Sequence, residues 1–204
     1  VKPGGPSPAS GGPGGPRPAS AGPGGTRKPR IATAWLGGCS GCHMSFVDMD
    51  ERLIDLAPLI DLVYSPIMDV KEFPLDVDAT LVEGAVANEE NLHHLKLIRE
   101  RTKFLVSFGD CAVTGNVTAM RNPLRKAEAV LKRAYIENVD LNPRRPADPG
   151  VVPVLLDRVR PLHEVVPVDV FLPGCPPSAD LIHFVLTELV AGRIPDLKDR
   201  LKYG

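Results

Sequence analysis

Four cysteines are the residues of this 204-residue chain whose type and spacing can do chemistry. Cys39 and Cys42 form a C-x2-C pair, whereas Cys111 and Cys175 come singly from far along the chain. Four thiolates bind either Zn2+ or an iron–sulfur cluster. A structural zinc site usually takes its ligands from two tight pairs, and this chain has one pair. The spacing therefore favours a cluster, and leaves zinc or free buried thiols as alternatives.

Each cysteine follows a strand-like apolar run that ends in glycine or proline-glycine. The runs are Ile31–Leu36, Phe104–Phe108 and Val168–Leu172. This pattern is typical of a buried strand whose carboxyl end opens into a loop, and glycine lets the backbone approach a ligand closely. Because ligands bind outside the carboxyl ends of parallel strands, we expect all four thiols to converge at one edge of a sheet.

The rest of the chain alternates strands with helices, which predicts right-handed crossovers, a parallel sheet and the α/β class. Two more strands are predicted at Asp61–Ser65 and Ala79–Val82. Helices are predicted, from apolar residues at helical spacing, at Asp48–Ile60 (with Asp48 as its cap), Asn88–Lys103, Pro123–Tyr135 and Ser178–Ala191. A helical turn is expected over Val154–Arg160.

Glu83 falls at the end of the third predicted strand and would join the thiols at that edge. It is either a solvated strand-end carboxylate or a cap of the next helix, or a buried group at a subunit interface that passes protons or polarises the site. His43, beside Cys42, either donates to a cluster sulfur or is a satisfied loop histidine, and the second is favoured.

Other side chains receive simpler interpretations. Asp110 and Thr114 are expected to hold their turn by bonds from side chain to backbone. Arg121 and Arg125 are treated as solvated charges rather than partner contacts. Trp35, inside the first strand, is expected in the core rather than as an electron conduit.

Composition excludes some functions. Apolar residues make up 43% of the chain, which is enough for a core, and Lys+Arg 24 nearly balance Asp+Glu 25. This balance, with only 5% aromatic residues, argues against a nucleic-acid partner. No apolar run approaches the ~18 residues of a membrane span, and no secretory signal is visible. We therefore expect a cytoplasmic protein, in which clustered cysteines more often bind metal than pair as disulfides.

The first part of the chain differs from the rest. Residues 1–29 are rich in proline and glycine, and GGPSPAS returns ten residues later as GGPRPAS. Such a segment has too little apolar surface to offset the entropy cost of ordering. We expect a disordered tail over 1–29 and one domain over 30–204.

Four motifs, in order along the chain, resemble those of the small subunit of cytoplasmic NAD-reducing (bidirectional) [NiFe] hydrogenases. They are GCSGCHMSFVDMDERL, TLVEGAVANEENL, LVSFGDCAVTGNVTAMRNP and FLPGCPPSADLI, and the resemblance covers essentially Arg30 to Pro195. The chain also resembles the cluster-bearing quinone-reductase subunit of respiratory complex I. That subunit has two adjacent cysteines where this chain has the spaced pair Cys39 and Cys42.

The resemblance implies a flavodoxin-like parallel sheet with helices on both faces. It implies one [4Fe–4S] cluster on Cys39, Cys42, Cys111 and Cys175, at the carboxyl ends of the strands. It also implies a hydrogenase large subunit with a Ni–Fe centre, and diaphorase subunits with iron–sulfur clusters and FMN that reduce NAD+. Glu83 would face the large subunit near the cluster, in a position to transfer protons.

The resemblance thus predicts an electron-transfer subunit of a hydrogen:NAD+ oxidoreductase, which is not catalytic alone. The cluster of this chain would be the proximal one, next to the Ni–Fe site. Three alternatives stay open. They are a related hydrogenase or complex-I-like subunit with another electron acceptor, a zinc-stabilised flavodoxin-like binding module, and a flavin binder without a cluster. A second flavin is not predicted, because no phosphate-cradling loop is free of cysteine.

Overall fold

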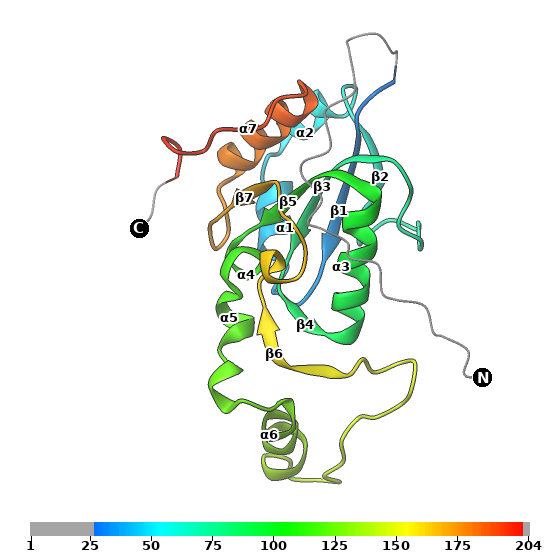
Figure 1. Cartoon of the computed structure of the whole chain (residues 1–204), viewed down its shortest axis with the longest axis vertical. Helices are drawn as coiled ribbons and strands as arrows, with labels where there is room; N and C mark the ends of the chain where they lie inside the picture. Colours follow the sequence, from blue (N-terminus) through cyan, green and yellow to red (C-terminus); the bar gives the residue numbers. More distant parts are fainter. Residues whose placement is uncertain (1–26, 202–204) are drawn as a thin grey trace, which may run out of the picture.

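A parallel five-stranded sheet forms the centre of the computed structural model, which describes residues 27–201 (Figure 1). The strand order is β2-β1-β3-β5-β7, and every neighbouring pair is parallel. Counted along the chain this order is 2-1-3-4-5, that of flavodoxin-like sheets. The strands are β1 (Arg30–Trp35), β2 (Asp61–Tyr64), β3 (Val77–Glu83), β5 (Thr102–Phe108) and β7 (Val170–Leu172). The predicted α/β fold with a parallel sheet is confirmed.

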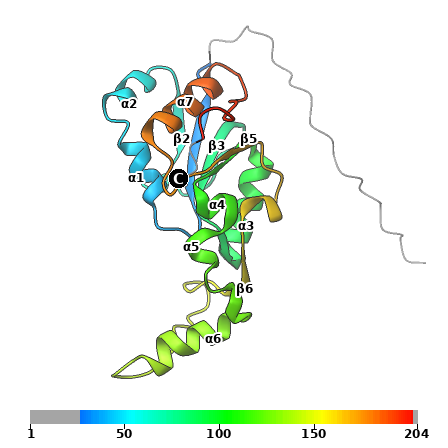
Figure 2. The same ribbon diagram turned by 90° about the vertical axis from the view of Figure 1, so that its left-hand side faces the viewer.

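Helices cover both faces of the sheet, because successive strand side chains point to opposite sides. On β3, Leu81 packs into one core with helix α7 (Ala179–Val190), and Val82 packs into a second core with α3 (Glu89–Arg101). Helices α1 (Gly41–Val47) and α2 (Glu51–Leu56) lie on the side of α7, as Figures 1 and 2 show. The expected two-sided coverage is therefore confirmed.

A smaller unit, which we call the distal lobe (residues 116–160), projects beyond the sheet in Figures 1 and 2. Its strand β6 (Leu155–Arg160) pairs antiparallel with β4 (Val86–Asn88), which follows β3. The predicted helical turn over Val154–Arg160 is therefore wrong. Its helical segments are α5 (Asn116–Ala119), η1 (Asn122–Leu124), α6 (Ala127–Lys132) and η2 (Arg133–Glu137), in chain order.

The outer edge of β6 is closed by a single amide side chain. Asn122 donates from Nδ2 to the Val159 carbonyl at 2.9 Å and accepts from the Val159 N–H at 2.8 Å. The side chain thus satisfies the two backbone groups that an edge strand would otherwise leave unpaired. Asn122 therefore protects part of the outer edge of β6.

Two predicted helices are shorter than expected. The segment Asp48–Ile60 contains only α2, which Asp50 precedes at φ 49, a backbone conformation that does not continue from α1. The predicted cap at Asp48 is therefore wrong. The helix predicted over Pro123–Tyr135 begins only at Ala127, because Arg125, at φ 65, separates it from the preceding 3-10 turn.

The start of the described chain is tied to the amino end of the sheet. Arg27 and Lys103 both pair with Asp78, and the Pro29 carbonyl accepts from the Asp61 N–H at 2.9 Å. Burial opposes ionisation of Asp78, but hydrogen bonds from the Arg30 N–H, Lys103 and Arg27 outweigh it and lower its pKa. Most of the predicted tail, 1–26, lies outside the described residues. Within 27–201 no helix is long and apolar enough to cross a bilayer.

Candidate metal centre

The loop with Cys39 and Cys42 leaves the sheet where β1 lies beside β3. The Leu36 N–H donates to the Glu83 carbonyl at 2.8 Å, and Gly37 exchanges two backbone hydrogen bonds with Ala85, at 2.9 and 2.7 Å. A Cβ atom on Gly37 would lie 2.9 Å from the Cβ of Ala87, so only glycine fits this close approach. The chain then enters α1, and Cys42 lies in its first turn.

Glu83 caps α1 from a distant strand. The residue before the helix, Ser40, makes no side-chain cap bond. The Glu83 carboxylate instead accepts from the N–H of Cys42 at 3.4 Å and of His43 at 3.0 Å. These are first-turn donors that have no partner within a helix, and a carboxylate there also suits the helix dipole. Glu83 is 2% exposed, so the solvated alternative for it is wrong. The predicted cap of the next helix is also wrong, because Glu83 caps α1, which precedes it in the chain, and Asn88 caps α3.

His43 completes this arrangement. Its Nδ1 lies 2.5 Å from Glu83 Oε2, and its ring packs edge-on against Trp35 and tilted against Phe108. Its Nε2 is buried, and no hydrogen-bond partner for it lies in the described part of the chain. His43 therefore lies in a helix and has a hydrogen-bond partner at only one of its two ring nitrogens. The favoured prediction of a satisfied loop histidine is wrong. Trp35 is 40% exposed at this edge, so its predicted core position is wrong.

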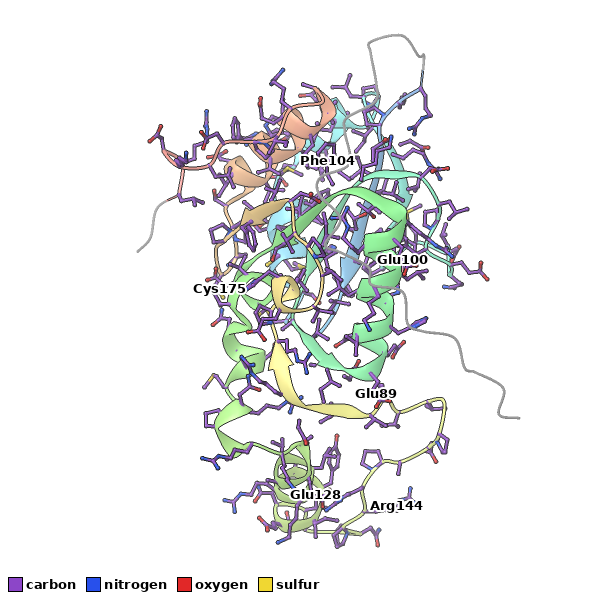
Figure 3. All side chains as sticks on the ribbon, in the orientation of Figure 1. Glu89, Glu100, Phe104, Glu128, Arg144 and Cys175 are labelled. Carbon is purple, nitrogen blue, oxygen red and sulfur yellow. The ribbon has the colours of Figure 1, made fainter. Side chains whose placement is uncertain are left out.

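The loops with Cys111 and Cys175 lie against each other. The Gly109 N–H donates to the Leu172 carbonyl at 2.8 Å, which continues the ladder between β5 and β7. The Asp110 N–H then donates to the Gly174 carbonyl at 2.9 Å, and the Gly174 N–H returns a 2.7 Å bond to the Asp110 carboxylate. Figure 3 shows Cys175 beside helix α4 (Asp110–Thr114), which carries Cys111.

Thr114 behaves as expected, and Asp110 does so only in part. Thr114 Oγ1 donates to the Asp110 carbonyl at 2.9 Å, and the Asp110 carboxylate accepts the bond from Gly174. Both predicted bonds from side chain to backbone are therefore present. The Asp110 bond links two loops rather than closing one turn.

Cys42 joins the first loop to the other two. A Cβ atom on Gly109 would lie 2.1 Å from Cys42 Sγ, and Gly109 has φ +83, so glycine is required on both counts. Cys42 is therefore seated directly on the loop that leads to Cys111. Cys42 and Cys111 are 7% and 9% exposed, whereas Cys39 and Cys175 are exposed. The four cysteines come from three adjacent loops at the carboxyl edge of the sheet.

The electrostatics of these loops disfavour the thiolate form of the buried cysteines when no cation is bound to them. Burial raises the pKa of Cys42, and so do the charge of Glu83 and the three other cysteines. Burial also raises the pKa of Cys111, although hydrogen bonds from Thr118 and Val117 oppose this. A bound metal centre reverses this balance, because a coordinating thiol is deprotonated.

A mononuclear ion and a cluster make different demands on these residues. Within 27–201, no three His, Cys, Asp or Glu side chains converge on one ion position. A cluster distributes its cysteine ligands over several irons, so it does not need sulfurs that meet at a point. Four thiols on three loops that contact one another fit that requirement. The assignment of the four cysteines as ligands stays a prediction.

The structure brings in two residues that sequence reasoning missed or misread. Thr118, in α5, donates from Oγ1 to the Gly37 carbonyl at 2.9 Å, and nothing in its sequence context signals this role. Arg121 donates to the Ala87 carbonyl at 2.9 Å, so it fastens the distal lobe to β4 and is not simply solvated. Arg125 is exposed, as expected.

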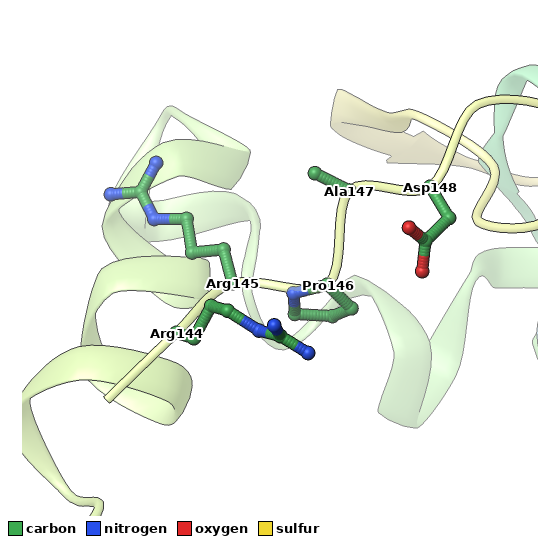
Figure 4. Close-up of a pocket in the computed structure, with 5 residues that line it drawn as sticks. All are labelled: Arg144, Arg145, Pro146, Ala147 and Asp148. Atoms are coloured by element: carbon green, nitrogen blue, oxygen red, sulfur yellow. The ribbon is translucent and has the colours of Figure 1, made fainter. Parts of the chain in front are cut away.

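A hollow in the distal lobe is lined by residues 144–148, shown in Figure 4. Arg145 is already paired with Glu128 at 2.6 Å. The hollow contains none of the residues that sequence analysis singled out, and we assign no function to it.

Comparisons with known proteins identify the relatives of this chain. Residues 39–189 match the family model described as the NADH ubiquinone oxidoreductase, 20 Kd subunit. The chain is 42% identical over 174 residues to the NAD-reducing hydrogenase HoxS subunit delta of Cupriavidus necator, which covers 83% of this chain and 82% of that protein.

Two further similarities show how much of other hydrogenase subunits this chain covers. A subunit of the F420-non-reducing hydrogenase of Methanothermobacter marburgensis is 41% identical over 173 residues, which cover 81% of this chain. The chain spans about half the length of such relatives, 54% and 56% for two of them. A chain in the crystal structure of an NAD+-reducing [NiFe]-hydrogenase in the H2-reduced state superposes with a TM-score of 0.81. The two chains are 44% identical, and the match covers 87% of this chain and 100% of the hydrogenase chain.

Proposed function

This chain belongs to the family of the 20 Kd subunit of NADH ubiquinone oxidoreductase, and on that premise we propose that it is the small, electron-transfer subunit of an NAD-reducing [NiFe] hydrogenase. The observation that carries the proposal is the meeting of the three cysteine loops at one sheet edge. The similarity to the delta subunit of an NAD-reducing hydrogenase, over 82% of its length, supports NAD+ as the acceptor.

Cys39, Cys42, Cys111 and Cys175 would hold one [4Fe–4S] cluster. Such a cluster, when bound, accepts and releases single electrons. The protein's own part is to fix the ligands: Glu83 caps the helix that carries Cys42, and Asp110 clamps the loop of Cys175. Burial of Cys42 and Cys111 keeps water from one side of the site.

The partner at this edge would be a hydrogenase large subunit with the Ni–Fe centre. Large apolar side chains are exposed near the cysteine loops: Met44 and Val47 on α1, Val117 on α5, and Met120, which directly follows α5. Exposed apolar groups of this kind favour an obligate protein interface. Diaphorase subunits with iron–sulfur clusters and FMN would pass the electrons on to NAD+. We place the assembly in the cytoplasm, where thiols stay reduced.

Glu83 would have a second role at this interface. Its carboxylate contacts His43 Nδ1, and the buried His43 Nε2 has no partner among the described residues. A partner chain that supplies a hydrogen-bonding group at this nitrogen would complete a path for protons from Glu83 to the interface. Retained hydrogen–deuterium exchange activity in an assembled Glu83→Gln enzyme would argue against this path.

A second candidate function differs only in the acceptor. The F420-non-reducing relatives are about as similar to this chain as the NAD-reducing one, at 41% and 42% identity. Reduction of NAD+ by H2 in the assembled complex distinguishes the two, because the second candidate predicts H2 oxidation with an artificial dye but not with NAD+.

The ligand assignment is tested with Cys111→Ser in the assembled complex. We expect H2-driven NAD+ reduction to fall at least tenfold, because the serine oxygen is a poor substitute for a thiolate on the cluster. Thr114→Ser, one turn further along α4, is the matched control and should retain activity. Undiminished turnover in Cys111→Ser would remove that cysteine from the electron path.

A further inference from the structure

Helix α1 buries two of its seven residues, and one of the two is polar. Cys42 is 7% exposed, and Ser45, one turn further along, is 6% exposed. Residues three apart on a helix lie on the same face, so both side chains point to the same side of α1. A buried hydroxyl needs a partner, and the Ser45 hydroxyl donates to the Pro177 carbonyl at 2.6 Å. Ser45 therefore joins the helix of Cys42 to the loop that carries Cys175.

The loop of Cys175 is attached to the rest of the protein on both sides of the cysteine. Before the cysteine, the Asp110 N–H donates to the Gly174 carbonyl at 2.9 Å, and the Gly174 N–H donates to the Asp110 carboxylate at 2.7 Å. After the cysteine, the Pro177 carbonyl accepts the bond from Ser45, and Pro177 is buried. Cys175 itself is exposed between these two attachments.

The two attachments act on a single narrow turn. Gly174 has φ +135, and a Cβ atom there would lie 2.6 Å from the N and Cα atoms of Pro177. Only glycine fits so close an approach of two backbone segments. Gly174 and Pro177 are therefore in direct backbone contact, and Cys175 is one of the two residues between them.

Each attachment comes from a helix that carries another cysteine. Asp110 belongs to α4, which carries Cys111. Ser45 belongs to α1, which carries Cys42. The Ser45 hydroxyl therefore links the position of Cys175 to that of Cys42. Loss of this hydroxyl would leave the bonds from Asp110 in place and would free the loop only from α1.

We propose that Ser45 is a positioning residue that holds the Cys175 thiol in place to bind its iron of the [4Fe–4S] cluster. This inference rests on the function proposed above. Without the hydroxyl, the buried Pro177 carbonyl loses its donor, and the equilibrium that keeps the loop on α1 weakens about tenfold. The iron bound by Cys175 should then be the first to leave, because only the loop of Cys175 has lost an attachment.

The test follows iron loss from the full chain when ferricyanide oxidises it. Ferricyanide takes one electron from a [4Fe–4S]2+ cluster, which then releases one Fe2+ and leaves [3Fe–4S]+. The three-iron product gives an electron paramagnetic resonance signal, and the released thiol becomes open to alkylation by iodoacetamide. The sequence has four cysteines in all, so peptide mass spectrometry identifies the ligand that was released.

We expect Ser45→Ala to form the three-iron product about tenfold faster than wild type, with alkylation at Cys175. Ser45→Thr keeps the hydroxyl and should stay close to the wild-type rate. Thr102→Ala is the matched control, because Thr102 is also 6% exposed and its hydroxyl is hydrogen-bonded to that of Thr80 at 2.7 Å. Thr102 lies at the amino end of β5, so this variant should lose stability but release iron at the wild-type rate.

The possible failures can be told apart. Iron release at the wild-type rate in Ser45→Ala, or alkylation of another cysteine before Cys175, would overturn the positioning role. Equally fast release in Thr102→Ala would also overturn it, because a general loss of stability would then explain the effect. A wild-type chain without iron and sulfide would instead overturn the proposed function.

Discussion

At the scale of single residues, Glu83 shows how a distant side chain can organise a ligand loop. Its carboxylate comes from β3, yet it satisfies the first-turn N–H groups of α1, where Cys42 lies. Ser40, the local residue that normally supplies such a cap, contributes no side-chain bond. The position of Cys42 therefore depends on contacts between residues about forty positions apart in the chain.

We expect Glu83→Ala to destabilise the fold by about 1–3 kcal/mol, since it removes a cap and leaves buried N–H groups unpaired. Glu83→Gln keeps one acceptor oxygen and should lose less. Glu100→Ala, an exposed carboxylate on α3 labelled in Figure 3, is the matched control. Urea denaturation measures all three, and equal midpoints for Glu83→Ala and the control would exclude the capping role.

His94 makes a second prediction at the residue scale. Burial lowers its pKa, Glu90 opposes this and His93 adds to it, and the ring packs against Tyr64 and Phe73. The unfolded chain therefore binds more protons at this site than the folded chain, so stability rises with pH. The contribution of neutral His94 to the free energy of unfolding is lost as the pH falls below about 6.5, the pKa of histidine in the unfolded chain.

This prediction is checked by unfolding free energies at pH 7.5 and pH 5.5. The stability lost between the two should be smaller in His94→Leu than in wild type. His183→Leu on α7 serves as the control. The same pH dependence in His94→Leu and wild type would show that His94 does not contribute to it.

At the scale of elements, the distal lobe depends on β6 and on the side chain that closes its edge. Asn122 makes two hydrogen bonds with Val159, a residue that is almost fully buried. Further ties are Arg121 to the Ala87 carbonyl and the Ala127 N–H to Asp157. The lobe is joined to β4 by the pairing of β4 with β6, by Arg121 and by a small apolar cluster of Ala85, Ala87 and Val159, whereas the sheet is held by two larger apolar cores.

We expect Asn122→Ala to cost about 1–3 kcal/mol locally, because both Val159 backbone groups lose their partner. Hydrogen exchange should accelerate at Val159 and its neighbours on β6, while β3 and β5 keep their protection. Asn138→Ala, at an exposed position of the lobe, is the control. Unchanged protection of Val159 in Asn122→Ala would contradict this role.

At the scale of the whole molecule, the sheet and its cysteine edge follow from local pattern. The apolar runs are long enough to identify all five strands, and glycines after them mark the loops. The strand β6 was missed because its partner β4 has three residues and its second edge is closed by a side chain. Helix α1 was missed because its glycine-rich start is typical of a loop, and the Glu83 carboxylate that caps it comes from a strand far along the chain. Such contacts between distant residues leave no periodic signal in the sequence.

The central claim is that the four cysteines of this chain jointly hold one iron–sulfur cluster. The most direct measurement is the iron, zinc and acid-labile sulfide content of the full chain, purified without oxygen. We predict about four irons and four sulfides per chain, with no flavin absorbance. One zinc per chain and no sulfide, or bound FMN without iron, would contradict the account.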